Sequence, residues 1–355
     1  MIIIMMYFLL LFYSYYVLGN NEPFSDLTQY WGDSLNWYLF DVNHVPFYSL
    51  TLGFFRTISF DIFKPLGLMQ LVTFINFIIS IIFVYKTIFL INKNEKLALF
   101  SSFLFALWPC VGITQVVIPS ADIVACSLFV SGIYFLHSKR IVYGSLLFGL
   151  SMLAHKVMWP FSFFILVVYL LNNFSLISNK KMALSFILYI TPLVSLWICG
   201  SVYHSDPFWI ISSNIKDNLS SNSDLIIFDG LLGPLIYYQS IDKVMKGLLV
   251  IGTFLLSGFL FKVAVKEKFI GWEISVGILL AIILLSIIVE QYEIWIIVRF
   301  GRLLVFPLAF YLVSLDKLPY SRFQTMIIKL GFIVLSLSQF LFMKYSNDYM
   351  SILFL

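Results

Sequence analysis

Long apolar segments separated by short polar segments make up almost the whole chain. Their approximate positions are residues 1–18, 66–90, 97–114, 121–137, 141–154, 158–172, 182–202, 247–263, 270–289, 302–315 and 325–342. A helix needs about 20 apolar residues to cross a hydrocarbon core of roughly 30 Å, whereas a barrel strand alternates apolar with polar positions. The pattern therefore predicts an all-α integral membrane protein that crosses the bilayer about eleven times. Residues 1–18 lack the basic start of a signal peptide, so we expect an uncleaved first helix.

The composition strengthens this interpretation. Of 355 residues, 61% are hydrophobic and 11% are charged, and the mean hydropathy is +0.97, whereas soluble domains carry about 25% charged residues. The net charge of +4 is spread between the apolar segments, so no nucleic-acid partner is implied. The three cysteines, Cys110, Cys126 and Cys199, lie in apolar stretches without CxxC spacing, which indicates neither a disulfide framework nor a metal motif. Without a repeat or a linker, residues 1–355 are expected to form a single polytopic membrane domain.

The charges between the segments predict the orientation. With a cytoplasmic N-terminus, the inner loops are residues 86–96, 138–140, 173–181, 262–273 and 316–322, and they hold 12 of the 22 basic residues but 4 of the 18 acidic residues. This distribution agrees with the positive-inside rule. The longer polar segments then lie on the outer face of the membrane, where we expect the chemistry to occur.

The first outer loop contains two segments that are too short to cross a membrane. Asp26, Tyr30, Asp33 and Trp37 share one face if their stretch is helical, and the segment from Pro46 to Phe60 is apolar and aromatic. Tyr and Trp favour the headgroup level, so both segments are expected to form interfacial helices. A carboxylate there can act as a base, bind a metal or solvate the loop. Asp26 is the stronger candidate for a functional role because it opens an aromatic segment directly after the first apolar segment.

A second carboxylate and several cations face the same side. In PSADIVACSLF, Pro119 and Ser120 predict a helix start, and Asp122 falls in its first turn, where it either serves the site or simply complements the helix dipole. The outer basic residues are His155, Lys156, Arg56, Lys64, Arg299 and Arg302. Basic residues on the disfavoured side would be explained by an anionic ligand such as a lipid phosphate, or by snorkelling to headgroups.

The order of these features resembles the GT-C superfamily of polytopic glycosyltransferases. The matching pieces are SDLTQYW followed by HVPFYSLTLGFF, then PSADIVACSLFVSGIYFL, HSKR, GSLLFGLSMLAHKVMWP and, late in the chain, VRFGRLLVFPLAFYL. The resemblance covers residues 1–172 best. The chain departs from the protein O-mannosyltransferases because its first loop has no adjacent Asp-Glu pair, which makes a peptide acceptor less favoured.

The resemblance implies an inverting sugar transfer at the outer face of a bacterial inner membrane. The donor would be a polyprenyl-phosphate-linked sugar, and the acceptor a hydroxyl of a glycan or lipid of the cell envelope. Asp26 would be the catalytic base and Asp122 a second catalytic carboxylate, while Lys156, Arg299 and Arg302 would stabilise the departing phosphate. A divalent metal could bind through Asp26 and Asp122, but no cofactor is established by the sequence.

Two other interpretations stay open. An O-antigen or capsule polymerase or ligase has a similar number of spans and one large outer loop, here residues 203–246 with His204 and Lys243, although that loop lacks arginine. A lipid or polysaccharide transporter or flippase would instead bury charges within the spans and show symmetric halves.

Overall fold

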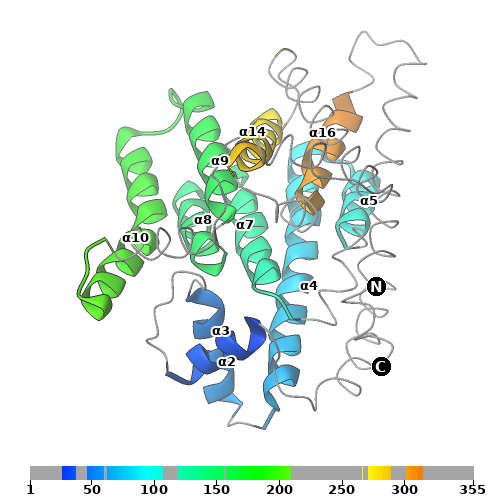
Figure 1. The fold of residues 1–355 in the computed structure, drawn as a ribbon. Helices are drawn as coiled ribbons and strands as arrows, with labels where there is room; N and C mark the ends of the chain where they lie inside the picture. The colour runs from blue at the N-terminus through cyan, green and yellow to red at the C-terminus, as the bar shows by residue number, and fades with distance from the viewer. Residues whose placement is uncertain are drawn as a thin grey trace, which may run out of the picture. The chain divides into compact units, whose positions relative to one another are not determined.

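The computed structural model describes residues 26–36, 46–59, 62–106, 119–155, 157–208, 266, 271–288 and 301–314 (Figure 1). Every regular element in this part of the chain is a helix, which confirms the all-α prediction there. The helices are α2 (Asp26–Asn36), α3 (Phe47–Ile58), α4 (Pro65–Asn92), α5 (Glu95–Ala106), α7 (Ala121–His137), α8 (Ile141–Ala154), α9 (Met158–Asn172), α10 (Asn179–His204), α14 (Trp272–Ile288), the 3-10 helix η1 (Gly301–Leu304) and α16 (Val305–Ser314).

Two of the described helices, α4 with 28 residues and α10 with 26, are long and apolar enough to cross a membrane. Four further apolar helices among the described residues are shorter, with 17 residues in α7, 14 in α8, 15 in α9 and 17 in α14, whereas a straight crossing needs about 20. The predicted spans at 1–18, 247–263 and 325–342 lie outside the described residues. These helices are consistent with a membrane protein, and the count of about eleven crossings stays a prediction.

The described helices fall into two compact units. The first unit holds α2, α3, most of α4, α7, α8 and α10, and the second holds the end of α4, α5, most of α9, α14, η1 and α16. The single domain expected over residues 1–355 stays a prediction. The candidate site below lies within the first unit.

A tight turn joins α7 to α8 in the first unit. The Ser138 N–H donates to the Tyr134 carbonyl at 2.8 Å and the Arg140 N–H to the Phe135 carbonyl at 2.9 Å, while Lys139 takes a left-handed φ of 65°. Such closing bonds satisfy the last carbonyls of a helix. Because the turn is short, α7 and α8 pack as an antiparallel hairpin, and the start of α7 lies at the same end of the unit as the last residue of α8.

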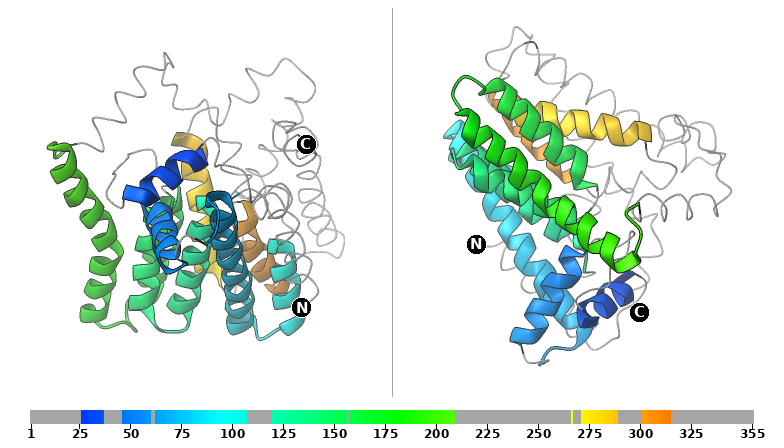
Figure 2. Two further views of the ribbon diagram at one scale, coloured as in Figure 1. Left: turned by 90° about the horizontal axis from the view of Figure 1, so that it is seen from below. Right: turned by 90° about the vertical axis from the view of Figure 1, so that its left-hand side faces the viewer.

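Small residues let the helices of this unit approach closely. A Cβ built on Gly149 of α8 would lie 2.6 Å from the Tyr189 carbonyl oxygen and 2.9 Å from Pro192, both in α10. The views in Figure 2 show α7, α8 and α10 running side by side. The α2–α3 pair lies at one end of these helices, and α3 also packs against α8 (Figure 1).

Gly144 gives a prediction about stability. Its Cβ position would lie 2.9 Å from the Gly132 carbonyl oxygen and 2.9 Å from the Leu136 backbone nitrogen, and neither backbone atom can move without separating α7 from α8. We expect Gly144→Ala to cost about 1–3 kcal/mol, as overpacked sites do. SDS unfolding of the purified protein measures the loss. The control is Gly32→Ala in α2, where nothing lies within 4 Å of the Cβ position. Equal unfolding midpoints for the two variants would contradict the close approach.

Candidate functional site

Asp122 stands in the first turn of α7, as the sequence predicted. Ser120 is the N-cap, with extended backbone at φ −150° and ψ 135°, and its Oγ accepts the Asp122 N–H at 3.1 Å. Asp122 is buried, with 3% of its surface exposed. The positive end of the helix dipole favours a carboxylate at this position.

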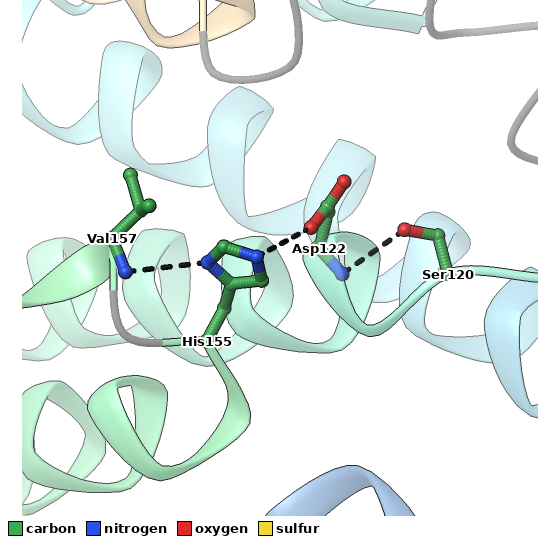
Figure 3. A network of polar contacts seen from close by, with 4 residues as sticks. All are labelled: Ser120, Asp122, His155 and Val157. Carbon is green, nitrogen blue, oxygen red and sulfur yellow. Dashed lines mark hydrogen bonds and ion pairs between the residues drawn. The ribbon is translucent and has the colours of Figure 1, made fainter. Parts of the chain in front are cut away.

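His155 pairs with this carboxylate (Figure 3). It follows the last residue of α8, and its extended backbone turns the ring toward α7, where Nε2 lies 3.2 Å from Asp122 Oδ1. The other ring nitrogen, Nδ1, accepts the Val157 N–H at 3.2 Å. A nitrogen that accepts a hydrogen bond carries no proton, so this geometry assigns the neutral ring with its proton on Nε2. His155 therefore donates to Asp122.

This pairing limits what His155 can do. Both of its ring nitrogens already contact protein groups, so a direct contact with a substrate phosphate would break one of these two bonds. Protonation of the ring would likewise break the bond to Val157, because Nδ1 would lose its lone pair. The geometry instead suits His155 to orient the Asp122 carboxylate. A carboxylate held in this way can accept a hydrogen bond or bind a cation.

Polar side chains of α4 form hydrogen bonds with residues at and near the start of α7. The Ser120 N–H donates to Thr73 Oγ1 at 3.3 Å, and further along α7 the Ser127 hydroxyl donates to Asn76 Oδ1 at 2.6 Å. These contacts join residues 47 and 51 positions apart in the chain. They fix α7 against α4 close to Asp122.

The α4 side chains were not among the residues selected from the sequence, although a signal was present. Gln70, Thr73, Asn76 and Ser80 recur at spacings of three, three and four within an apolar segment. Such spacing places them on one face of a helix, and polar residues in a membrane helix usually face other helices. Gln70, Thr73 and Ser80 are fully buried.

The first-loop residues lie on α2, α3 and the segment before α4. Asp26 begins α2, and the helix also contains Tyr30 and Asp33. Arg56 is in the last turn of α3 and half-buried, and Lys64 is exposed just before α4. The helices predicted in this loop are confirmed as helices, while their position at a membrane surface stays a prediction.

The remaining cations are only partly described. Arg302 lies in η1 of the second unit, fully buried, with its guanidinium carbon 5.4 Å from the centre of the Phe105 ring of α5. A cation over an aromatic face is stabilised by the ring quadrupole. Lys156 and Arg299 lie outside the described residues, so convergence of the three cations on one phosphate stays a prediction.

A metal centre has no clear basis in the described part of the chain. No group of three or more His, Cys, Asp or Glu side chains there could hold a metal ion. Asp122 contributes one carboxylate, and the Asp26 side chain is not described.

Comparison with models of protein families, with curated proteins and with solved structures finds no match to this chain.

Proposed function

We propose that the protein is a membrane glycosyltransferase of the GT-C type, which transfers a sugar from a polyprenyl-phosphate-linked donor to an acceptor hydroxyl at the outer face of the membrane. The observation that carries the proposal is the site at one end of the first unit. There a buried carboxylate, Asp122, contacts His155, and the α2–α3 pair, whose first helix begins at Asp26, packs at the same end (Figure 1).

The proposed reaction needs a base and a stabilised leaving group. The Asp26 carboxylate takes the proton of the acceptor hydroxyl as its oxygen attacks the anomeric carbon. The bond between that carbon and the phosphate oxygen breaks, the configuration inverts, and polyprenyl phosphate leaves with the electron pair. Positioned base assistance contributes about 10²- to 10⁴-fold, and cations stabilise the charge that develops on the phosphate.

The second carboxylate has a different task. Asp122 already accepts a hydrogen bond from His155, so we assign it a positioning task and leave the proton transfer to Asp26. It would orient the acceptor hydroxyl by accepting its hydrogen bond, or hold a divalent metal together with Asp26. Lys156, Arg299 and Arg302 are the proposed ligands of the donor phosphate, and a glycan or lipid is the proposed acceptor.

Release of polyprenyl phosphate tests the function. The purified chain in nanodiscs is incubated with a set of labelled polyprenyl-phosphate sugars and with envelope glycans and lipids as acceptors. We expect free polyprenyl phosphate to appear together with a glycosylated acceptor. Intact donor in every combination, with a folded protein, would contradict the proposal.

The orientation has its own test. In a background with the three native cysteines replaced by serine, single cysteines at Asn21 and Ser221 should react with an impermeant maleimide in cells with a permeabilised outer membrane. A cysteine at Asn94, in the exposed connection between α4 and α5, should react only after the inner membrane is opened. The expectation follows from the excess of basic residues in the inner loops. Labelling at Asn94 while the inner membrane is intact would reverse the orientation.

A further inference from the structure

Thr73 is connected to the Asp122–His155 pair through a short series of contacts. It lies in α4, fully buried, and its Oγ1 accepts the Ser120 N–H just before α7 begins. Ser120 then caps the Asp122 N–H with its own hydroxyl, and Asp122 accepts from His155. The bond to Thr73 therefore holds the start of α7 against α4, while the bond between Ser127 and Asn76 holds α7 further along.

Tyr48 extends these contacts to the first-loop helices. Its ring lies 5.0 Å from the ring of Tyr30 in α2, edge to face, and the whole side chain is buried. Its hydroxyl lies beside Thr73 without reaching the geometry of a hydrogen bond. Burial raises the pKa of this hydroxyl above its ordinary value, so it stays protonated. Tyr48 therefore brings α3, and with it Tyr30 of α2, close to Thr73 of α4.

We propose that Thr73 is a positioning residue that holds the Asp122 carboxylate in line with the His155 ring and, through Tyr48, keeps the α2–α3 pair next to that carboxylate. Thr73 has no assigned role in the chemistry. Thr73 supplies the acceptor for the Ser120 N–H. This N–H needs an acceptor outside the helix, because the first N–H groups of a helix have no partner within it. Without that acceptor, this partly buried N–H must find another partner, and the first turn of α7 shifts.

The ring of His155 reports on this shift independently of any activity. The chain contains four histidines, so ¹⁵N-histidine NMR of the full protein in nanodiscs resolves few signals, and His155→Gln identifies the signal of His155. In the wild type we expect the neutral ring with its proton on Nε2. Thr73→Val keeps the shape of the side chain but removes the acceptor. In this variant the ¹⁵N chemical shifts of the two His155 ring nitrogens should move toward each other, because a mixture of the two tautomers forms.

Two variants separate positioning from general packing. Thr73→Ser retains the hydroxyl and should keep the wild-type His155 signal. Thr87→Val makes the same change at another fully buried threonine of α4 and should also leave the signal unchanged. If Thr73→Val does not fold, Thr73→Ala removes the same acceptor and is interpreted in the same way. A wild-type His155 signal in the folded acceptor-free variant would overturn the proposal, as would an equal shift in Thr87→Val.

The consequence for sugar transfer rests on the proposed function. Thr73→Val should lower kcat by about 3-fold, less than Asp122→Asn, with little change in the KM for the donor, because the carboxylate is displaced while the phosphate ligands are untouched. A shifted His155 signal in a chain that transfers no sugar would sustain the positioning role and reject the proposed function. A normal His155 signal in Thr73→Val, together with sugar transfer by the wild type, would reject the positioning role and sustain the proposed function.

Discussion

Asp26→Asn is expected to lower the rate of sugar transfer by at least about 100-fold. The amide keeps the size and most of the hydrogen-bonding capacity of the carboxylate, but it cannot accept the proton of the attacking hydroxyl. Protein yield and donor affinity should hardly change, since the residue begins α2 and has no proposed contact with the donor phosphate. Steady-state transfer by the purified variant measures the effect.

Two neighbouring carboxylates serve as controls for the loss of charge. Asp33 lies in the same helix as Asp26, and Asp41 follows in the same loop outside the described residues. Neither occupies the position that the family resemblance assigns to the base. Asp33→Asn and Asp41→Asn should therefore cost much less than Asp26→Asn. Near-normal turnover by Asp26→Asn would remove the base assignment and most of the support for the mechanism.

Asp122→Asn is expected to give the second largest effect, a fall of about 10-fold in turnover. The amide oxygen can still accept the Nε2–H of His155, so the pair is retained while the negative charge is lost. A residue that only complements the helix dipole would cost about 0.3–1 kcal/mol of stability and leave turnover unchanged. Parallel measurement of turnover and of the SDS unfolding midpoint separates the two roles.

The coupling between Asp122 and His155 can be measured directly. If His155 acts by orienting Asp122, the losses of turnover in His155→Gln and Asp122→Asn should not add in the double variant. A phosphate-binding His155 would instead raise the KM for the donor in its own variant, and the two losses would add. The first outcome is expected because both ring nitrogens of His155 already contact protein groups, Asp122 and the Val157 N–H.

The helices next to the site were predictable because polar residues mark their ends. The predicted segments 121–137, 141–154 and 158–172 coincide with α7, α8 and α9, since Ser120, the Ser138–Arg140 turn and the His155 segment interrupt the apolar pattern. Helix α10 runs three residues earlier and two residues later than the predicted 182–202 segment, because Ser178 caps its start and Ser205 ends it in a left-handed conformation. Apolarity alone does not indicate such caps.

The composition of the site was only partly predictable. The short turn between α7 and α8 implies that Asp122 and His155 lie at the same end of a hairpin, and both were selected from the sequence. Their direct contact was not, because it depends on the extended backbone of His155, which turns the ring toward α7. Thr73 was missed because a threonine in a long apolar helix is equally compatible with a bond to its own backbone.

Sugar transfer in sealed vesicles tests the central claim most directly. Proteoliposomes with the chain in one known orientation receive the labelled donor in the outer leaflet and a water-soluble acceptor outside. We predict transfer when the outer face of the protein is exposed, no transfer when it faces the lumen, and at least about 100-fold less with Asp26→Asn in the exposed orientation. Equal transfer in both orientations, or by wild type and Asp26→Asn alike, would contradict an outward site built on these carboxylates.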